Sequence, residues 1–216
     1  PLNNLNFLIT AGPTHEKIDP VRYIGNSSSG KMGYNLAKKA LELGANVTLI
    51  IGPTNLLMDL KDIKSIRVED SQEMFNEIIK LFDSSDVVIC SAAISDFKPA
   101  KTKQNKIKKE NGLDSIKLEP TIDILKKLGS IKTSQYLVGF ALETDNIIEN
   151  AKKKLKSKNL DAIVVNKIDD FNPISSDYNQ IDFINSTLKI TSFDKKLKSN
   201  VSVDILNQII KNVKGT

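Results

Sequence analysis

Strand and helix patterns alternate along the first 90 residues, and this order restricts the fold more than any other feature of the sequence. In chain order, the patterns predict a strand at 6–10, a helix at 31–43, strands at 46–51 and 65–68, a helix at 71–82 and a strand at 86–90. Gly44 is placed to cap the C-terminal end of the first helix, and Ser71 the N-terminal end of the second. Strands that alternate with helices pair in parallel, with the helices on both faces of the sheet. The sequence therefore predicts an α/β fold.

The alternation is less regular after Cys90. The patterns predict an aperiodic loop at 98–111, a strand at 115–118, a helix at 122–128, strands at 136–141 and 162–165 separated by a helix at 146–158, a hairpin of 181–184 and 188–192 that turns at Asn185–Ser186, and a helix at 203–213. We expect one domain over residues 1–216 with a Rossmann-like, parallel-core sheet and a C-terminal β-hairpin region. Within it we distinguish a nucleotide-binding half at 1–95, a mobile lysine loop at 96–112, and the remainder of the sheet at 113–216, where we expect dimerisation.

Composition excludes several classes of function. The net charge of +5 comes from lysine, since Arg22 and Arg67 are the only arginines, and aromatic residues make up 6% with no Trp. Surfaces that bind nucleic acid favour arginine and stacking aromatics, so we expect no nucleic-acid partner. No apolar run reaches the ~18 residues of a membrane span and no secretory signal is present, so we expect no membrane association. A single cysteine, Cys90, excludes an internal disulfide, and we expect a cytoplasmic protein.

Glycines and serines follow the first strand and lead into the first helix. Gly12 ends the strand, and residues 25–33 read GNSSSGKMG. Such a loop at a helix N-terminus favours an anion, because backbone N–H groups and the helix dipole both face it. A P-loop requires Ser or Thr where this chain has Met32, and the dinucleotide fingerprint G-x-G-x-x-G is absent. A nucleotide loop of another design and a plain Gly/Ser-rich surface loop both remain open on spacing alone.

Residues 9–33, ITAGPTHEKIDPVRYIGNSSSGKMG, closely resemble the opening of phosphopantothenoylcysteine synthetase, also called phosphopantothenate–cysteine ligase. The resemblance continues at 91–97 (SAAISDF), 106–109 (KIKK), 121–125 (TIDIL), 138–144 (VGFALET), 159–161 (NLD), Asn166 and 176–179 (SDYN), so that it spans residues 6 to the C-terminus. The chain departs from the family pattern at Ile122, where proline is usual, and at Ser95, where alanine is usual and a hydroxyl is added near the site. In bacteria this family usually forms the C-terminal half of a bifunctional coenzyme A biosynthesis protein. Both a standalone chain and a segment that follows a covalently linked N-terminal decarboxylase domain before Pro1 stay open.

The resemblance implies a ligase that joins 4′-phosphopantothenate to L-cysteine with CTP. The substrate carboxylate would attack the α-phosphate of CTP to give an acyl-cytidylate and pyrophosphate, and the cysteine amine would then displace CMP. Mg²⁺ would enter with the CTP phosphates, and no NAD or flavin is expected in this domain. The resemblance also implies a homodimer. A dehydrogenase and a non-catalytic nucleotide- or nucleic-acid-binding module stay as alternative classes.

The resemblance also implies roles for individual residues. As catalytic residues it implies Asn26, which would orient the acyl-cytidylate, and Lys106, which would close over the site. As CTP-binding residues it implies Gly12, Ala92, Asp96, Lys106, Thr121, Ile122, Asp123, Ile124, Phe140, Lys154 and Lys158. As phosphopantothenate-binding residues it implies Asn26, Ser28, Ser29, Gly30, Lys31, Met32 and Ala92. No metal-binding residue is implied.

Taken without the resemblance, these residues have simpler interpretations. Asn26 could cap a turn, Lys106 could be a solvated lysine in a lysine-rich loop, and Phe140 could be a core residue. Lys154 and Lys158 lie four apart on one helix face, where both would reach a triphosphate or both would face solvent. The one histidine, His15, we interpret as incidental. We interpret Cys90 as a buried strand residue without a nucleophilic role, since no histidine is placed to activate it.

Overall fold

The computed structural model describes residues 2–111, 115–142, 145–166 and 176–213. Its strands are β1 (Asn6–Ala11), β2 (Glu16–Lys17), β3 (Tyr23–Ile24), β4 (Asn46–Ile51), β5 (Lys64–Arg67), β6 (Val87–Cys90), β7 (Phe97–Pro99), β8 (Leu118–Pro120), β9 (Tyr136–Leu142), β10 (Ala162–Asn166), β11 (Tyr178–Asn185) and β12 (Ile190–Leu197). Its helices are α1 (Lys31–Glu42), α2 (Ser71–Phe82), α3 (Ile124–Ile131), α4 (Ile147–Ser157) and α5 (Lys198–Val213), with a 3-10 turn, η1, at Lys109–Asn111.

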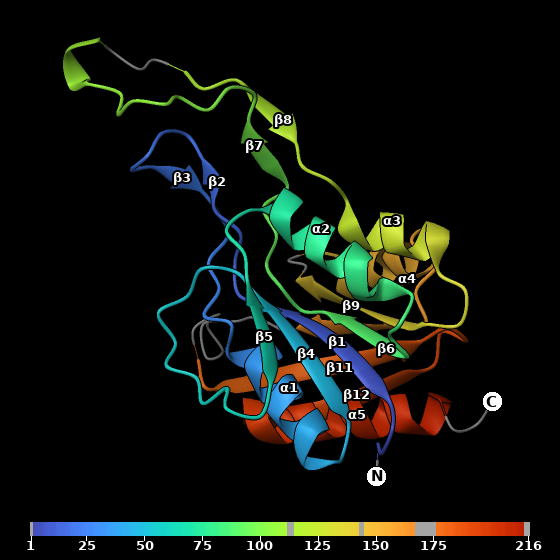
Figure 1. Cartoon of the computed structure of the whole chain (residues 1–216). Coiled ribbons are helices and arrows are strands. Elements are labelled where there is room, and N and C mark those ends of the chain that lie inside the picture. The colour runs from blue at the N-terminus through green and yellow to red at the C-terminus, as the bar shows by residue number, and fades with distance from the viewer. Residues whose placement is uncertain (1, 112–114, 143–144, 167–175, 214–216) are drawn as a thin grey trace.

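Eight strands form one sheet in the order β12-β11-β10-β9-β6-β1-β4-β5, in which the six from β10 to β5 run parallel and β11 and β12 are antiparallel. Helices α1 and α5 cover one face of the sheet, and α2, α3 and α4 cover the other (Figure 1). Apolar side chains pack on both faces of the sheet, as expected of parallel strands that are covered by helices on each side. The predicted α/β fold with a C-terminal hairpin is confirmed.

The order of the strands reverses direction beside β1. The chain passes from β1 to β4 and β5 on one side, and then returns through α2 to β6 on the other side of β1. In open α/β sheets the crevice that binds ligands lies outside the carboxyl ends of the strands at such a reversal. A ligand-binding site is therefore expected at the segments that follow Ala11 and Cys90.

Two small antiparallel sheets form an arm that extends away from the main sheet (Figure 1). Strand β2 pairs with β3, and β7 pairs with β8. The sequence pattern predicts an aperiodic loop at 98–111 and a strand at 115–118. In the structure, β7 overlaps the start of that loop, η1 forms its end, and β8 overlaps the predicted strand at Leu118 alone. Strands of two or three residues carry no periodic signal, which explains why β2, β3 and β7 were missed.

Most other elements differ from the prediction by no more than three residues at either end, but α5 begins at Lys198 instead of 203 and β12 ends at Leu197 instead of 192. One helix cap also differs. The cap of α2 is Asp70, whose side chain accepts a hydrogen bond from the Glu73 N–H (2.8 Å), so the prediction of Ser71 was wrong by one residue. Ser71 is the first residue of the helix, and its N–H donates to Glu16 Oε1 (2.9 Å). Gly44 follows α1 with a φ of 94°, as a C-terminal cap requires. Among the described residues, no helix combines the length and the apolarity that crossing a membrane would require.

Candidate functional site

Hydrogen bonds join the carboxyl ends of β1 and β6. The Ser91 hydroxyl donates to the Thr10 carbonyl (2.6 Å), and the Ala92 N–H donates to Thr10 Oγ1 (3.2 Å). Beyond the strands, the Ala93 N–H donates to the Gly12 carbonyl (2.9 Å). The two chain segments are thus held side by side as they leave the sheet, and their backbone would be close to a ligand bound at this edge.

Residues 25–30, which contain Ser27, Ser28 and Ser29 and are called the serine loop below, lie next to the end of β1. A Cβ atom on Gly30 would lie 3.3 Å from the Gly12 nitrogen, and both glycines have positive φ values, 75° and 78°. Thr54, which follows β4, donates its hydroxyl to the Ser29 carbonyl (2.9 Å). The Ser28 hydroxyl accepts from the Gly30 N–H at 3.3 Å. These contacts fix the loop directly above the end of β1, where side chains at the two glycine positions would be strained.

Helix α1 starts in this loop without a side-chain cap, and its first turn contains no acidic residue. Its N-terminal N–H groups and dipole therefore remain suited to an anion. The helix can approach the sheet closely because of Gly33, where a Cβ atom would lie 2.5 Å from the Ala11 Cβ and 2.7 Å from the Ser91 hydroxyl. This approach places the helix start over β1 and β6.

A pocket of about 520 Å³ opens at these strand ends. It is lined by residues 26–33, 91–94 and 140–142 and by Lys154, Asn166, Tyr178, Asn179 and Lys198. All the residues implied as phosphopantothenate-binding line it, namely Asn26, Ser28, Ser29, Gly30, Lys31, Met32 and Ala92, and so do Phe140 and Lys154 from the CTP-binding set. Phe140 also packs against the core, as its simpler interpretation predicts, and its role in binding CTP stays a prediction. The pocket thus collects side chains from segments far apart in the sequence.

Asn26 is oriented by the segment after β6. Its amide Nδ2 donates to the Ile94 carbonyl at 2.8 Å, although the residue is exposed. This bond uses one of the two amide hydrogens and sets the plane of the amide group. Asn26 does not cap α1, because this helix begins after Gly30, and its catalytic role stays a prediction.

Lysines give one side of the pocket a positive charge. Lys31 forms an ion pair with Asp177 (2.5 Å), and the hydrogen bond and charge of Lys31 lower the pKa of Asp177. Lys198 is only 7% exposed and donates to the Ser176 carbonyl. Burial lowers the pKa of Lys198, and the Lys31 charge lowers it further, whereas Asp177 acts in the opposite direction. Lys198 lies outside the C-terminal helix that the sequence pattern predicts at 203–213 and was not predicted as a site residue.

A second group of predicted residues lies together outside the pocket lining. Lys158 donates to the Asp123 carboxylate (3.0 Å), which also caps α3 by accepting from the Lys126 N–H (3.0 Å). The Thr121 N–H donates to the Asp96 carbonyl (3.0 Å), and Asp96 itself is exposed. Ile124 is buried, and Ile122 packs against the same core. Lys154 lines the pocket, whereas Lys158 pairs with Asp123, and that both reach a triphosphate stays a prediction.

Lys106 lies on the arm and does not line the pocket. It is exposed, and the segment around it rests on the turn between β2 and β3 through several hydrogen bonds. Gly12 supports the serine loop from below without lining the pocket. The structure thus brings Asn26 to the pocket and leaves the other predicted catalytic residue apart from it.

The surroundings of Cys90, Ser95 and His15 define the state of three further side chains. Burial raises the pKa of Cys90 to about 12 although Lys158 lowers it, so the thiol stays protonated at neutral pH. Ser95 is buried and donates its hydroxyl to the Phe97 carbonyl (2.7 Å), so it adds no hydroxyl to the pocket. His15 stacks on Tyr23 with ring centroids 3.5 Å apart. The stacked pair lines a second hollow of about 610 Å³ that shares the serine loop with the pocket.

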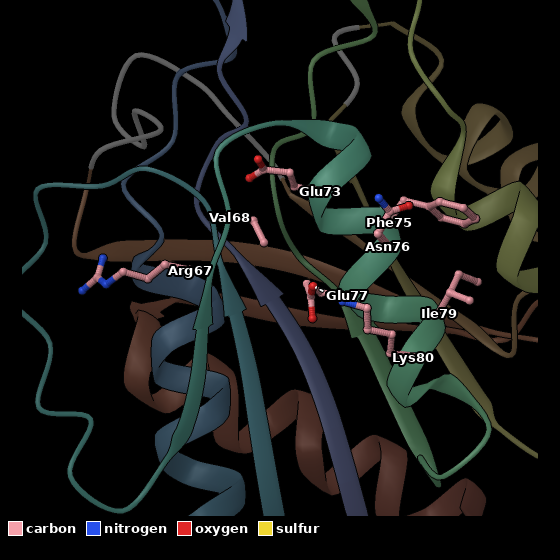
Figure 2. Close-up of a pocket in the computed structure, with 8 residues that line it drawn as sticks. All are labelled: Arg67, Val68, Glu73, Phe75, Asn76, Glu77, Ile79 and Lys80. Atoms are coloured by element: carbon pink, nitrogen blue, oxygen red, sulfur yellow. Dashed lines mark hydrogen bonds and ion pairs between the residues drawn. The ribbon is translucent and has the colours of Figure 1, made fainter.

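Another hollow, of about 570 Å³, lies over the outer side of α2 (Figure 2). Figure 2 shows that its side chains diverge, with Arg67 pointing away from Phe75 and Ile79. Lys80 pairs with Glu77 on the helix itself (2.5 Å). Since no polar groups converge there, we assign no binding role to this hollow.

No group of three or more potential metal-binding side chains occurs among the residues that the structure describes. The described lining of the pocket also contains no carboxylate. These residues therefore form no resident magnesium site, since Mg²⁺ prefers carboxylate and phosphate oxygens.

Comparison with known proteins gives consistent matches over nearly the whole chain. Residues 2–213 match the sequence model of the family described as DNA/pantothenate metabolism flavoprotein C-terminal domain. The Coenzyme A biosynthesis bifunctional protein CoaBC of Bacillus subtilis (strain 168) is 47% identical over 168 residues, which cover 78% of this chain and 41% of that protein. The crystal structure of the C-terminal domain of a Coenzyme A biosynthesis bifunctional protein CoaBC superposes with a TM-score of 0.85 at 39% identity, covering 99% of this chain and 98% of that one.

One relative has a different name. A protein of an unknown prokaryotic organism named Cysteine/Cysteine sulfinic acid decarboxylase is 45% identical over 212 residues, which cover 97% of this chain and 59% of that protein. The chain thus spans about half the length of the curated relatives it matches.

Proposed function

This chain belongs to the family described as DNA/pantothenate metabolism flavoprotein C-terminal domain, and on that premise we propose that it is a phosphopantothenate–cysteine ligase. The observation that carries the proposal is the pocket above β1, β6 and β9, in which a serine loop, an uncapped helix start and lysines converge. Phosphate groups are recognised by such donors. The match to the C-terminal domain of CoaBC over 99% of this chain supports the same assignment.

In the proposed reaction, the carboxylate of 4′-phosphopantothenate attacks the α-phosphate of CTP. A bond forms between the carboxylate oxygen and phosphorus, and pyrophosphate leaves. The amine of L-cysteine then attacks the carbonyl carbon of the acyl-cytidylate, loses a proton, and displaces CMP. This chemistry depends on orientation and on charge stabilisation more than on a strong protein nucleophile, which agrees with the protonated thiol of Cys90.

Within this proposal, the serine loop and the start of α1 hold the phosphate of phosphopantothenate. Asn26, oriented by Ile94, presents its remaining amide hydrogen and its oxygen to the acyl-cytidylate. Lys154 lines the pocket from α4 and binds the nucleotide phosphates. Asp96, Thr121, Ile122, Asp123, Ile124 and Lys158 contribute to the nucleotide side of the site next to the pocket. Lys106 stabilises the charge that develops during transfer.

Mg²⁺ in this proposal is bound by the phosphates of CTP and is not held by a set of side chains. When bound there, it neutralises charge on the phosphates. The family description names a flavoprotein, but the part that matches this chain is the C-terminal domain, and no step proposed here uses a flavin. The second activity implied by the word "bifunctional" in the relatives' names is not assigned to this chain.

We also propose that the chain acts as a homodimer. The sequence predicts dimerisation in the region 113–216, which includes Leu118 on the arm, and further exposed apolar side chains lie on the arm outside that region. Val21, Tyr23, Phe97 and Leu118 are 60%, 53%, 51% and 44% exposed there. Exposed apolar patches are typical of protein interfaces, which favours the arm as the dimerisation surface.

Pyrophosphate release tests the proposed function. Release should require CTP together with 4′-phosphopantothenate, and phosphopantothenoylcysteine should form when cysteine is added, with ATP compared in parallel. Lys154→Gln should raise the KM for CTP by about 10-fold or more, the effect of losing one charge-assisted hydrogen bond. Lys153, exposed and adjacent on the same helix, provides the matched control Lys153→Gln, which should leave the KM unchanged. Release of CO₂ from cysteine without any nucleotide-dependent pyrophosphate would instead support the activity named for the decarboxylase relative.

A further inference from the structure

The turn between β2 and β3 contains a buried carboxylate, whereas the other residues of this turn are exposed or half-buried. The side chain of Asp19 is fully inaccessible to solvent, whereas that of its ion-pair partner Arg22 is 43% exposed. Asp19 Oδ1 accepts from the N–H groups of Val21 and Arg22, both at 2.8 Å. These two bonds close the turn itself. The other oxygen, Oδ2, makes different contacts.

Asp19 Oδ2 holds the lysine loop. It accepts from Arg22 Nη1 (2.6 Å) and from the N–H of Ile107 (3.1 Å). The same Nη1 of Arg22 donates to the Ile107 carbonyl (3.2 Å). The Asp19–Arg22 pair therefore holds both backbone polar groups of the residue next to Lys106.

The start of the lysine loop is attached to the same turn. The Thr102 hydroxyl donates to the Lys17 carbonyl (3.0 Å), and the Lys103 N–H donates to the Ile18 carbonyl (2.9 Å). Residues 102–107 are thus held at both ends on the β2–β3 turn. From β3 the chain continues through Gly25 into Asn26, so one hairpin connects the segments of both residues that the sequence identified as catalytic.

The charge of Asp19 is maintained by its surroundings. Burial raises the pKa of this carboxyl, but hydrogen bonds from the backbone of Val21, Ile107 and Arg22, together with the Arg22 charge, outweigh burial and lower the pKa to about 2. The carboxylate is therefore ionised at any pH at which an enzyme is assayed. A permanent charge of this kind suits a fixed structural contact and not a proton transfer.

We propose that Asp19 is a positioning residue that anchors the base of the lysine loop, through the backbone of Ile107, so that Lys106 reaches the site from a fixed point of the arm in the ligase reaction. The inference rests on the proposed function, which gives Lys106 its task. A charged group that stabilises a transition state is effective only when its position is fixed in advance, and errors of about 1 Å can reduce rates about 100-fold. On an exposed loop rich in lysine, the buried Asp19 carboxylate supplies that fixation.

The substitution Asp19→Asn separates this role from closure of the turn. The amide retains Oδ1, which can still accept from Val21 and Arg22, so the turn can form. The NH₂ group replaces Oδ2 and faces two donors, Arg22 Nη1 and the Ile107 N–H, with which it cannot hydrogen bond. The variant should thus release Ile107 selectively.

The experiment is a double-mutant cycle measured by pyrophosphate release. Asp19→Asn should lower kcat by about 10- to 100-fold, the usual range for a partner of a functional group, with little change in the KM for CTP. In a Lys106→Gln background the same substitution should cost less than about 3-fold, because the residue it positions is gone. Asp70→Asn, the same chemical change at the cap of α2, is the control and should leave kcat unchanged. An equal loss in both backgrounds, or no loss in either, would overturn the proposal.

Hydrogen exchange tests the role of Asp19 separately from the proposed ligase activity. The Ile107 amide should exchange faster in Asp19→Asn than in the parent chain, and this measurement needs no activity. If the parent releases no pyrophosphate, the proposed function fails, while unchanged exchange at Ile107 refutes the hold on the loop separately. Should Asp19→Asn not fold, Arg22→Lys enters the same cycle, since a single ammonium cannot pair with Asp19 and also reach the Ile107 carbonyl at the present geometry. If Arg22→Lys lowers kcat equally in the parent and in the Lys106→Gln background, this variant too contradicts the proposal.

Discussion

At the scale of single residues, Cys90 and Asp19 show how the same physical effect leads to opposite results. Both side chains are buried, and burial disfavours the charged form of each. For Cys90 burial dominates and raises the pKa to about 12. For Asp19 three backbone hydrogen bonds and the Arg22 guanidinium outweigh burial, and the pKa falls to about 2. The number of donors around a buried group thus decides whether it keeps its charge.

The pKa of Asp19 predicts a dependence of stability on pH. Because the folded-state value of about 2 is below the ordinary value of 3.8, the ionised carboxylate stabilises the folded chain fully above pH 3.8. That contribution is lost as the pH falls through 3.8 toward 2. The difference in urea midpoint between the parent and Asp19→Asn should therefore be constant from about pH 5 to 8 and shrink below pH 4. Urea denaturation followed by circular dichroism measures it. A difference that stays constant down to the acid limit of folding would contradict the assigned cause.

At the scale of elements, the packing of α1 on β1 depends on a glycine inside the helix. Gly33 is buried, and its missing side chain allows the helix to approach Ala11 and Ser91. Helix propensity opposes this choice, since glycine in a helix is about 1 kcal/mol less favourable than alanine. At the start of α1, which follows the serine loop, close packing therefore outweighs the low helix propensity of glycine.

Gly33→Ala tests which effect dominates. Propensity alone predicts that the variant is more stable by about 1 kcal/mol. The geometry predicts the opposite sign, a loss of about 1–3 kcal/mol, because the new Cβ would lie 2.5 Å from the Ala11 Cβ and the helix must shift. Urea denaturation at neutral pH measures the difference in the free energy of unfolding. Lys38→Ala, at an exposed position of the same helix, is the control and should change it by no more than about 0.5 kcal/mol. A stabilised Gly33→Ala would refute the packing argument.

The elements that the sequence predicted are those with a long local signal. Helices and buried strands extend over enough residues for their periodicity to be recognised, and the predicted β4 agrees with the structure at both ends. Strands β7 and β8 pair across the lysine loop, so their partner is not visible in the local pattern. Of the site residues predicted from the sequence, those that line the pocket are Asn26, Ser28, Ser29, Gly30, Lys31, Met32, Ala92, Phe140 and Lys154. Lys198 was missed because only tertiary structure brings the start of α5 to the pocket.

At the scale of the whole molecule, the pocket exists because the strand order reverses beside β1. The reversal leaves a crevice above β1 and β6, which the serine loop, the carboxyl end of β9 and the start of α5 all line. The arm has no part in this sheet, and its strands are too short to be stable alone. Phe97 and Leu118 lie on the same face of the β7–β8 sheet, since Leu118 is opposite Pro99 and Pro99 is two residues from Phe97. An apolar face on a marginal sheet is best stabilised by a partner surface.

Leu118→Lys therefore tests the proposed dimer. Sedimentation should give the parent a mass of about twice 23.9 kDa, and the variant should dissociate at least about 100-fold more readily, because two-fold symmetry buries the new charge twice without a partner. Leu57→Lys provides the matched control, since Leu57 is 96% exposed and lies outside the arm. If the Leu118 variant stays dimeric while Ile190→Lys on β12 dissociates, the interface is the C-terminal hairpin that the sequence analysis favoured. A monomeric parent at all concentrations would refute both surfaces.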